Sequence, residues 1–147
     1  MTRSLWLVRQ IWSPILLTLV TLAAGTAAEP AAATDLSGCW NGHWESCTTG
    51  HQGPLNATFC QTCPTSYSVE FTGRFFKIVP FRYSVTLDVV SDDGTTVVLA
   101  GSSYLGRLAG TFSYQASATS TEFTANYSSC KDQGKFVLSR CCGSCGR

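Results

Sequence analysis

The residue types best suited to chemistry in this chain are its eight cysteines, four of which form two C-x-x-C pairs. The pairs are "CQTC" at 60–63 and "CGSC" at 142–145, and this is the spacing of structural zinc ligands. An even number of cysteines in an exported chain also indicates disulfide bonds. Two interpretations stay open for Cys60, Cys63, Cys142 and Cys145: one structural zinc site, or two disulfides. Redox catalysis is disfavoured, because nothing nearby resembles the helix N-terminus that lowers the pKa of a redox thiol.

Other residues that could catalyse a reaction are few. The chain has two histidines, His43 and His51, and no serine lies in the G-x-S-x-G setting of a nucleophile. No pair of carboxylates is spaced in a way that indicates general acid–base catalysis either. His51 lies in the polar stretch "TTGHQG", which is typical of a loop, and it remains a candidate for contacting a ligand. An enzyme is therefore the least supported class.

The start of the chain has the features of a signal peptide. Arg3 and Arg9 supply a basic region, an apolar stretch follows at 15–24, and small residues come next. We predict a signal peptide at 1–28, an Ala-rich linker at 29–36 and a single domain at 37–147 with a Cys-rich C-terminal tail. The domain is expected to be exported to a periplasmic, cell-surface or extracellular location. No later segment is long and apolar enough to be a transmembrane helix.

The charge of the domain is close to neutral. Without Arg3 and Arg9 the chain keeps 10 − 2 = 8 basic residues against 9 acidic ones. A nucleic-acid partner recognised through bulk positive charge is therefore not expected. The composition leaves a small apolar molecule as the partner to consider.

The pattern that dominates the domain is alternation of apolar and polar residues, which predicts β-strands with one inner and one outer face. Gly, Asp, Asn and Ser punctuate it, as in the hairpin signal Asp93-Gly94. Gly73 indicates a bulge. Sequential strands with short connections predict an all-β, eight-stranded antiparallel up-and-down (meander) barrel, because closing the sheet leaves no exposed strand edge to pair with another chain. The barrel is also expected to be disulfide-rich. The expected strands are 38–46, 53–60, 65–77, 81–91, 95–103, 106–115, 120–128 and 134–140.

The first expected strand begins with Gly38-Cys39-Trp40, and the last ends with Arg140. This combination resembles the calycin superfamily of lipocalin-like and avidin-like barrels, whose G-x-W motif lies on the first strand. The resemblance implies that Arg140 packs over Trp40 and closes one end of the barrel, a cation–π contact. Trp44 shares the inward parity of Trp40 and joins the structural core. No ligand follows from the resemblance.

The barrel topology narrows the choice of disulfides. The loop after the first strand and the turn before the last strand lie at the same, open end, so Cys47 and Cys130 are a candidate pair. At the closed end, Cys39 and Cys141 both have outward parity on neighbouring strands and form the second candidate pair. By chain-entropy arguments each bond would stabilise the domain by roughly 4–5 kcal/mol.

These observations favour an exported, non-catalytic β-barrel that binds a small apolar ligand inside. The alternative is a structural or envelope-interaction protein whose barrel is filled and holds no ligand. The candidate ligand contacts are inward-facing aromatic residues together with the loop histidine at the open end. They are Phe112, Tyr114, Phe123, Tyr127 and His51.

Overall fold

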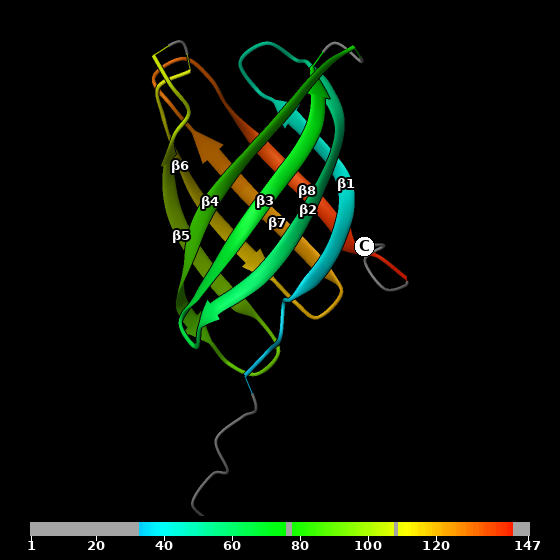
Figure 1. The fold of residues 1–147 in the computed structure, drawn as a ribbon, viewed down its shortest axis with the longest axis vertical. Helices are drawn as coiled ribbons and strands as arrows, with labels where there is room; N and C mark the ends of the chain where they lie inside the picture. Colours follow the sequence, from blue (N-terminus) through cyan, green and yellow to red (C-terminus); the bar gives the residue numbers. More distant parts are fainter. Residues whose placement is uncertain (1–32, 76–77, 108, 143–147) are drawn as a thin grey trace, which may run out of the picture.

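A computed structural model describes residues 33–75, 78–107 and 109–142 of the chain, and these form a closed antiparallel barrel (Figure 1). Each strand is hydrogen-bonded to the next in sequence, and the last pairs with the first. The all-β, up-and-down architecture expected from the alternation is therefore confirmed. The strands are β1 (Gly38–Ser46), β2 (Gln52–Cys63), β3 (Ser66–Phe75), β4 (Val79–Asp92), β5 (Val97–Tyr104), β6 (Thr111–Ala118), β7 (Glu122–Ser128) and β8 (Gln133–Arg140).

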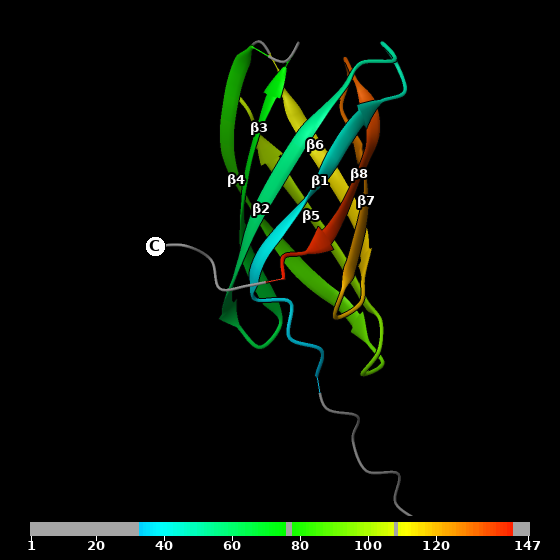
Figure 2. The ribbon, with the colours of Figure 1, turned by 90° about the vertical axis from the view of Figure 1, so that its right-hand side faces the viewer.

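The seam between β1 and β8 closes the barrel. Its register runs from Trp40 opposite Arg140 to Ser46 opposite Gly134, and Figure 2 shows the two strands side by side. A closed sheet leaves no strand edge with unpaired backbone groups, which is the usual way for a meander of this size to avoid edge-to-edge association.

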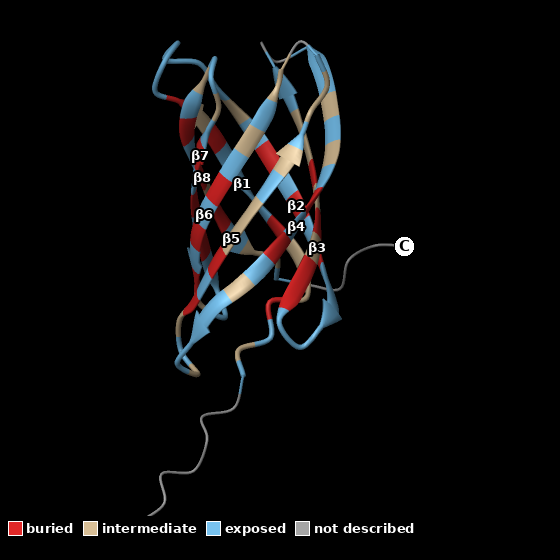
Figure 3. Ribbon diagram, turned by 90° about the vertical axis from the view of Figure 1, so that its left-hand side faces the viewer, coloured by how far each residue is buried: buried red, intermediate tan, exposed pale blue. Residues whose placement is uncertain are grey.

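Inner and outer positions alternate along the strands, as period-two patterning requires. In β7 every second residue is buried, and Figure 3 shows the same alternation around the barrel. The inward residues of all eight strands join in one hydrophobic core. The strand faces predicted from the sequence are therefore those that the structure shows for Val69, Val85 and Phe123.

The largest error in the expected strand boundaries concerns β6. It begins at Thr111 rather than at 106, because the preceding residues form a turn. Gly106 and Gly110 both adopt positive φ angles, of 90° and 80°, and the Gly110 amide donates to the Gly106 carbonyl at 2.7 Å. A positive φ is costly for residues with a side chain, so these two glycines end the ladder here.

Gly73 is not a bulge, contrary to the prediction. It pairs in register with Leu55 on one side and Phe81 on the other. The register shifts of the barrel lie elsewhere, between Gln61 and Cys63 and between Val89 and Ser91. Gly73 has a different role, described below, in making room for an aromatic ring.

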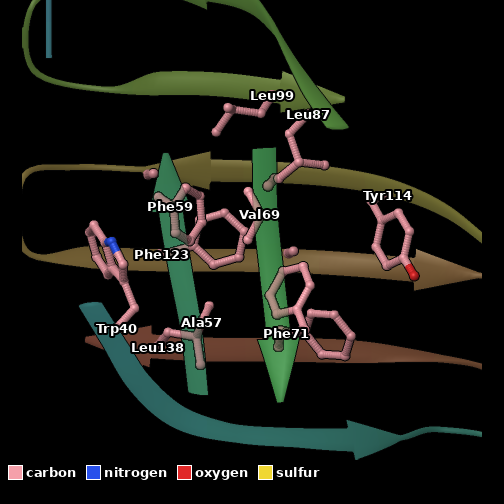
Figure 4. Packing of buried hydrophobic residues seen from close by; sticks show 14 of the residues in the cluster. Trp40, Ala57, Phe59, Val69, Phe71, Leu87, Leu99, Tyr114, Phe123 and Leu138 are labelled. Atoms are coloured by element: carbon pink, nitrogen blue, oxygen red, sulfur yellow. The ribbon is translucent and has the colours of Figure 1, made fainter. Parts of the chain in front are cut away.

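The closed half of the barrel is packed around Trp40. Its ring lies 5.6 Å from that of Phe59 and 6.4 Å from that of Phe123, and Phe59 and Phe123 meet edge to face at 5.1 Å (Figure 4). Leu36 is also fully buried, and its carbonyl accepts a hydrogen bond from the Trp40 indole at 2.9 Å. The last residue of the expected linker therefore belongs to the core.

Arg140 holds the covering segment in place. Its guanidinium carbon lies 4.7 Å from the centre of the Trp40 ring, the cation–π contact that the calycin resemblance implied. The same side chain donates to the carbonyls of Asp35 at 2.6 Å, Ser37 at 2.7 Å and Ser120 at 2.6 Å. Arg140 therefore ties the segment before β1 to the β6–β7 turn across the closed end.

Candidate ligand-binding site at the open end

A cavity of about 520 Å³ occupies the half of the barrel opposite Trp40. This volume lies in the range of small-molecule sites. Nine aromatic side chains line it, and eight of them, all except the exposed Tyr104, are called the aromatic cup below. Four come from β1, β3 and β4, namely Trp44, Phe75, Phe81 and Tyr83. Four come from β6, β7 and β8, namely Phe112, Tyr114, Tyr127 and Phe136.

Glycines on neighbouring strands explain why eight large rings leave a cavity. Four rings of the aromatic cup stand directly opposite a glycine in the strand register. The pairs are Trp44–Gly53, Phe81–Gly73, Tyr114–Gly101 and Tyr127–Gly134. A methyl group on Gly53 would lie 2.8 Å from Trp44 Nε1, and one on Gly134 would lie 2.7 Å from Tyr127 Cζ. The Trp44, Phe81 and Tyr127 rings therefore lie over their glycines, along the barrel wall, and the middle of the barrel stays open, whereas Gly101 lies against Leu87 and the Thr86 backbone.

A carboxylate, Asp132, lies in the wall of the cavity next to this ring system. Its Oδ1 accepts a hydrogen bond from Ser46 Oγ at 2.6 Å, and its Oδ2 accepts one from the Tyr127 hydroxyl at 3.1 Å. Ser129 Oγ in turn accepts the Asp132 amide at 3.0 Å. The β7–β8 turn thus presents a fixed negative charge to an otherwise apolar cavity.

Tyr114 has an unsatisfied hydroxyl. The residue is 2% exposed, and its oxygen has no hydrogen-bond partner among the described residues, although the neighbouring Tyr83 hydroxyl influences its titration. Leaving a buried polar group unpaired costs roughly 1–3 kcal/mol. Figure 4 shows this oxygen at the far side of the core from Trp40.

The tyrosines of the aromatic cup stay neutral at ordinary pH. Burial raises the pKa of Tyr83 far above its usual value, with the charge on Tyr114 adding to the effect. Burial likewise raises the pKa of Tyr114, and it raises that of Tyr127, where the Asp132 carboxylate adds to it. Their hydroxyls can therefore donate or accept hydrogen bonds but carry no charge.

Three of the predicted ligand contacts come together in this cavity: Phe112, Tyr114 and Tyr127. Phe123 does not, because it lies in the closed half against Phe59. His51 is exposed and is not part of the lining. The Phe123 difference follows from its position along the barrel axis, which the parity of a strand does not report. His51 lies in the loop between β1 and β2, where strand parity does not apply.

The sequence reasoning missed other residues of the site. Phe81 was not among the predicted ligand contacts, yet it lies near the start of β4 with its ring against Gly73. Asp132 lies in a polar turn, and carboxylates are so common in polar turns that the sequence does not mark this one as part of a site. The one signal available was the set of inward-facing glycines opposite aromatic residues, which required the strand register.

The cysteines of the described residues do not form the predicted disulfides. Cys47, Cys130 and Cys141 are free thiols, so neither Cys47–Cys130 nor Cys39–Cys141 is bonded, although the Cys141 amide donates to the Cys39 carbonyl at 3.0 Å. Strand register alone brings two outward side chains near each other without orienting their sulfur atoms for a bond.

The expected zinc ligands do not assemble within the described part of the chain. Cys60, Cys63 and Cys142 are exposed thiols, and Cys145 lies outside the described residues. No group of three or more potential metal ligands comes together among residues 33–75, 78–107 and 109–142.

Cys63 has an unusual environment for an exposed thiol. Its sulfur lies 3.0 Å from Ser66 Oγ and 3.5 Å from Thr65 Oγ1. Hydrogen bonds, first from Ser66 and then from Thr65, lower its pKa to about 7. A substantial fraction is therefore thiolate at neutral pH, the form that attacks disulfides.

Fold and site together define a closed antiparallel barrel that is filled at one end and hollow at the other. Comparison of the chain with family models, with curated proteins and with solved structures found no match to any of them. In the part of the chain that the structure describes, no helix is long and apolar enough to cross a membrane.

Proposed function

We propose that this protein is an exported, non-catalytic barrel that binds a small, largely apolar ligand in the aromatic cup. The observation that carries the proposal is the contrast within one barrel: an open cavity of about 520 Å³ lined by aromatic side chains, beside a closed half that is filled. Sites of this kind bury most of the surface of a small ligand against apolar side chains and orient it with a few polar groups. Here Asp132 is such a polar group.

The calycin resemblance remains part of this proposal. Arg140 over Trp40 at the closed end, with the cavity at the other end, supports it. The resemblance concerns architecture, and the ligand is inferred from the lining residues alone.

The proposal includes export and oxidation of the cysteines. The Cys47 amide donates to the Gln133 carbonyl at 2.8 Å, which places the β1–β2 loop against the turn that carries Cys130. Cys47 and Cys130 are free thiols in this structure, and we expect them to pair in an oxidising compartment and to fix the two loops beside Asp132. Peptide mapping without reductant tests this. A cross-linked peptide that contains both residues supports it, and free Cys47 and Cys130 in protein secreted by its host overturn it.

A structural or interaction protein is the second candidate. Apolar side chains are exposed at the open end, including Ile78 at 78%, Val79 at 50% and Tyr104 at 64%. Exposed apolar side chains of this kind favour contact with another surface. This candidate differs from the first because it does not need the cavity.

Blocking the cavity distinguishes the two candidates. Ser103 lines the cavity and Ser102, its neighbour on β5, is exposed. We expect the protein to bind N-phenyl-1-naphthylamine, an apolar fluorescent probe, and Ser103→Trp to abolish binding while Ser102→Trp retains it. Binding that survives Ser103→Trp in a folded variant would overturn the proposal. Native mass spectrometry of protein from its own host would then identify the natural ligand.

A further inference from the structure

Some rings of the aromatic cup lie against the barrel wall and leave room for an occupant on their other side. They do so where a glycine of the next strand makes space for the ring. The Phe81 ring covers Gly73 and the Trp44 ring covers Gly53 in this way. Tyr83 stacks on Phe81 at 6.0 Å and on Tyr114 at 6.5 Å, which continues the lining. The face of an aromatic ring carries partial negative charge and attracts cations.

Asp132 adds a full negative charge to the same cavity. The ion pairs of the described residues join Arg82 to Glu70 and Lys135 to Glu45, so neither of them neutralises Asp132. Its hydrogen bonds come from two hydroxyl groups, those of Ser46 and Tyr127, which leave the charge in place.

Arg82 does not cancel this charge. It contributes to the cavity wall, but its side chain is exposed, and its Nη2 donates to both carboxylate oxygens of Glu70 at 2.7 Å. Arg82 and Glu70 both stand between inward-facing neighbours on their strands and therefore face outward. The charge that faces the cavity is that of Asp132.

We propose that the ligand of the aromatic cup is an organic cation, a protonated amine on an aromatic or aliphatic body. This inference rests on the proposed function of the cavity. The aromatic faces replace water around the ammonium group, and Asp132 supplies the counter-charge. An anionic ligand would meet Asp132 at like charge, and a neutral one would leave the carboxylate without an ionic partner.

Three probes of nearly the same shape test the proposal on the wild-type protein: 2-phenylethylamine, 2-phenylethanol and phenylacetate, which are positive, neutral and negative at pH 7. Calorimetric titration should show the amine binding roughly tenfold more tightly than the alcohol, since cation–π and charge contributions of this size are typical of partly desolvated sites. Phenylacetate should bind most weakly of the three.

A matched pair of variants assigns the effect to one carboxylate. Asp132→Asn should lower the affinity for the amine to that for the alcohol. Glu122→Gln makes the same change of charge on an exposed side chain at the closed end and should leave all three affinities unchanged. Because Asp132 also binds Ser46 and Tyr127, Asp132→Asn can fail to fold, and the three probes on the wild type then decide.

The outcomes separate this inference from the proposed function. Equal binding of the amine and the alcohol overturns the organic cation and leaves the cavity a binding site for neutral molecules. An amine preference that a folded Asp132→Asn variant retains also overturns it, because the counter-charge is then elsewhere. Failure of all three probes to bind overturns both proposals.

Discussion

The closed half and the aromatic cup are built by the same eight strands, yet only one of them is filled. Around Trp40 the rings meet at angles, with Phe59 and Phe123 edge to face across the middle of the barrel. In the aromatic cup most neighbouring rings lie nearer to parallel, as for Tyr83 and Tyr114 at 22°, although Trp44 and Phe75 meet edge to face at 70°. The cavity therefore reflects how the aromatic rings are placed and does not require fewer of them.

Glycines beneath rings contribute to that placement. Trp40 stands between Ala57 and Arg140 in the register, so no glycine lies beneath its ring. Phe59 stands between Gly38 and Val69, yet no Phe59 atom lies within 4 Å of the place where a Gly38 side chain would begin, so its ring does not cover that glycine. Tyr127 stands opposite Gly134, whose missing Cβ lets the ring lie over the strand. Glycine weakens a strand in general, and here it provides space for a ring.

The largest effect should come from removing a ring of the closed half. Phe123 is fully buried, and Phe123→Ala should lower the free energy of unfolding by about 3–5 kcal/mol, because the cavity left behind has no water to fill it. Phe112→Ala, in the aromatic cup, should cost clearly less, since that ring is half-buried beside an existing cavity. Urea unfolding measures both. Equal losses would show that the two halves are packed alike.

The next effect concerns the closure of the filled half. Arg140→Lys keeps the charge but cannot donate to three carbonyls at once, and we expect a loss of about 2–3 kcal/mol in the free energy of unfolding. The control is Arg82→Lys, since its pair with Glu70 is exposed and should be worth less than about 1 kcal/mol. Guanidinium chloride screens such pairs, so urea is again the denaturant. A loss no larger than that of the control would mean that Leu36 covers the closed end without help from Arg140.

The same contrast explains how much of the molecule could be predicted. Parity predicted the inner faces and the bounds of β1, because alternation directly reports which side a residue faces. It also placed Arg140 over Trp40 once the barrel was assumed. These two predictions depend only on residues close together in the sequence or on the single pairing of β1 with β8.

The cavity could not be predicted in this way. It depends on which glycine stands opposite which ring, and a shift of one strand by two residues would keep every parity while separating Tyr127 from Gly134. The position along the barrel axis is equally hidden, which is why Phe123 was assigned to the ligand site. Asp132 is a further case, because only the fold shows that its turn borders the cavity.

The smallest effect at neutral pH should come from Tyr114→Phe. The hydroxyl has no partner among the described residues, so its removal should change the free energy of unfolding by only about 0–1 kcal/mol, and in the stabilising direction. The pH dependence is the sharper measurement. Because burial raises the pKa of Tyr114 in the folded state, the hydroxyl is neutral in both states below pH 10 and its contribution is constant there. Above about pH 10 the unfolded chain ionises first, and the wild type loses up to about 1.4 kcal/mol per pH unit from this group.

Tyr114→Phe removes that loss, so its stability should exceed that of the wild type by a margin that grows as the pH rises above 10. The control is Tyr104→Phe, which removes an exposed hydroxyl at the same end of the barrel and should follow the wild-type curve. Denaturation curves at several alkaline pH values measure the margin. A Tyr114→Phe variant that loses stability at neutral pH would show that the hydroxyl is hydrogen-bonded in solution. The cup would then hold an ordered water or ligand against Tyr114. In the closed half the buried polar groups already have partners within the described residues: the Trp40 indole donates to the Leu36 carbonyl, and the Tyr67 hydroxyl donates to the Thr34 carbonyl.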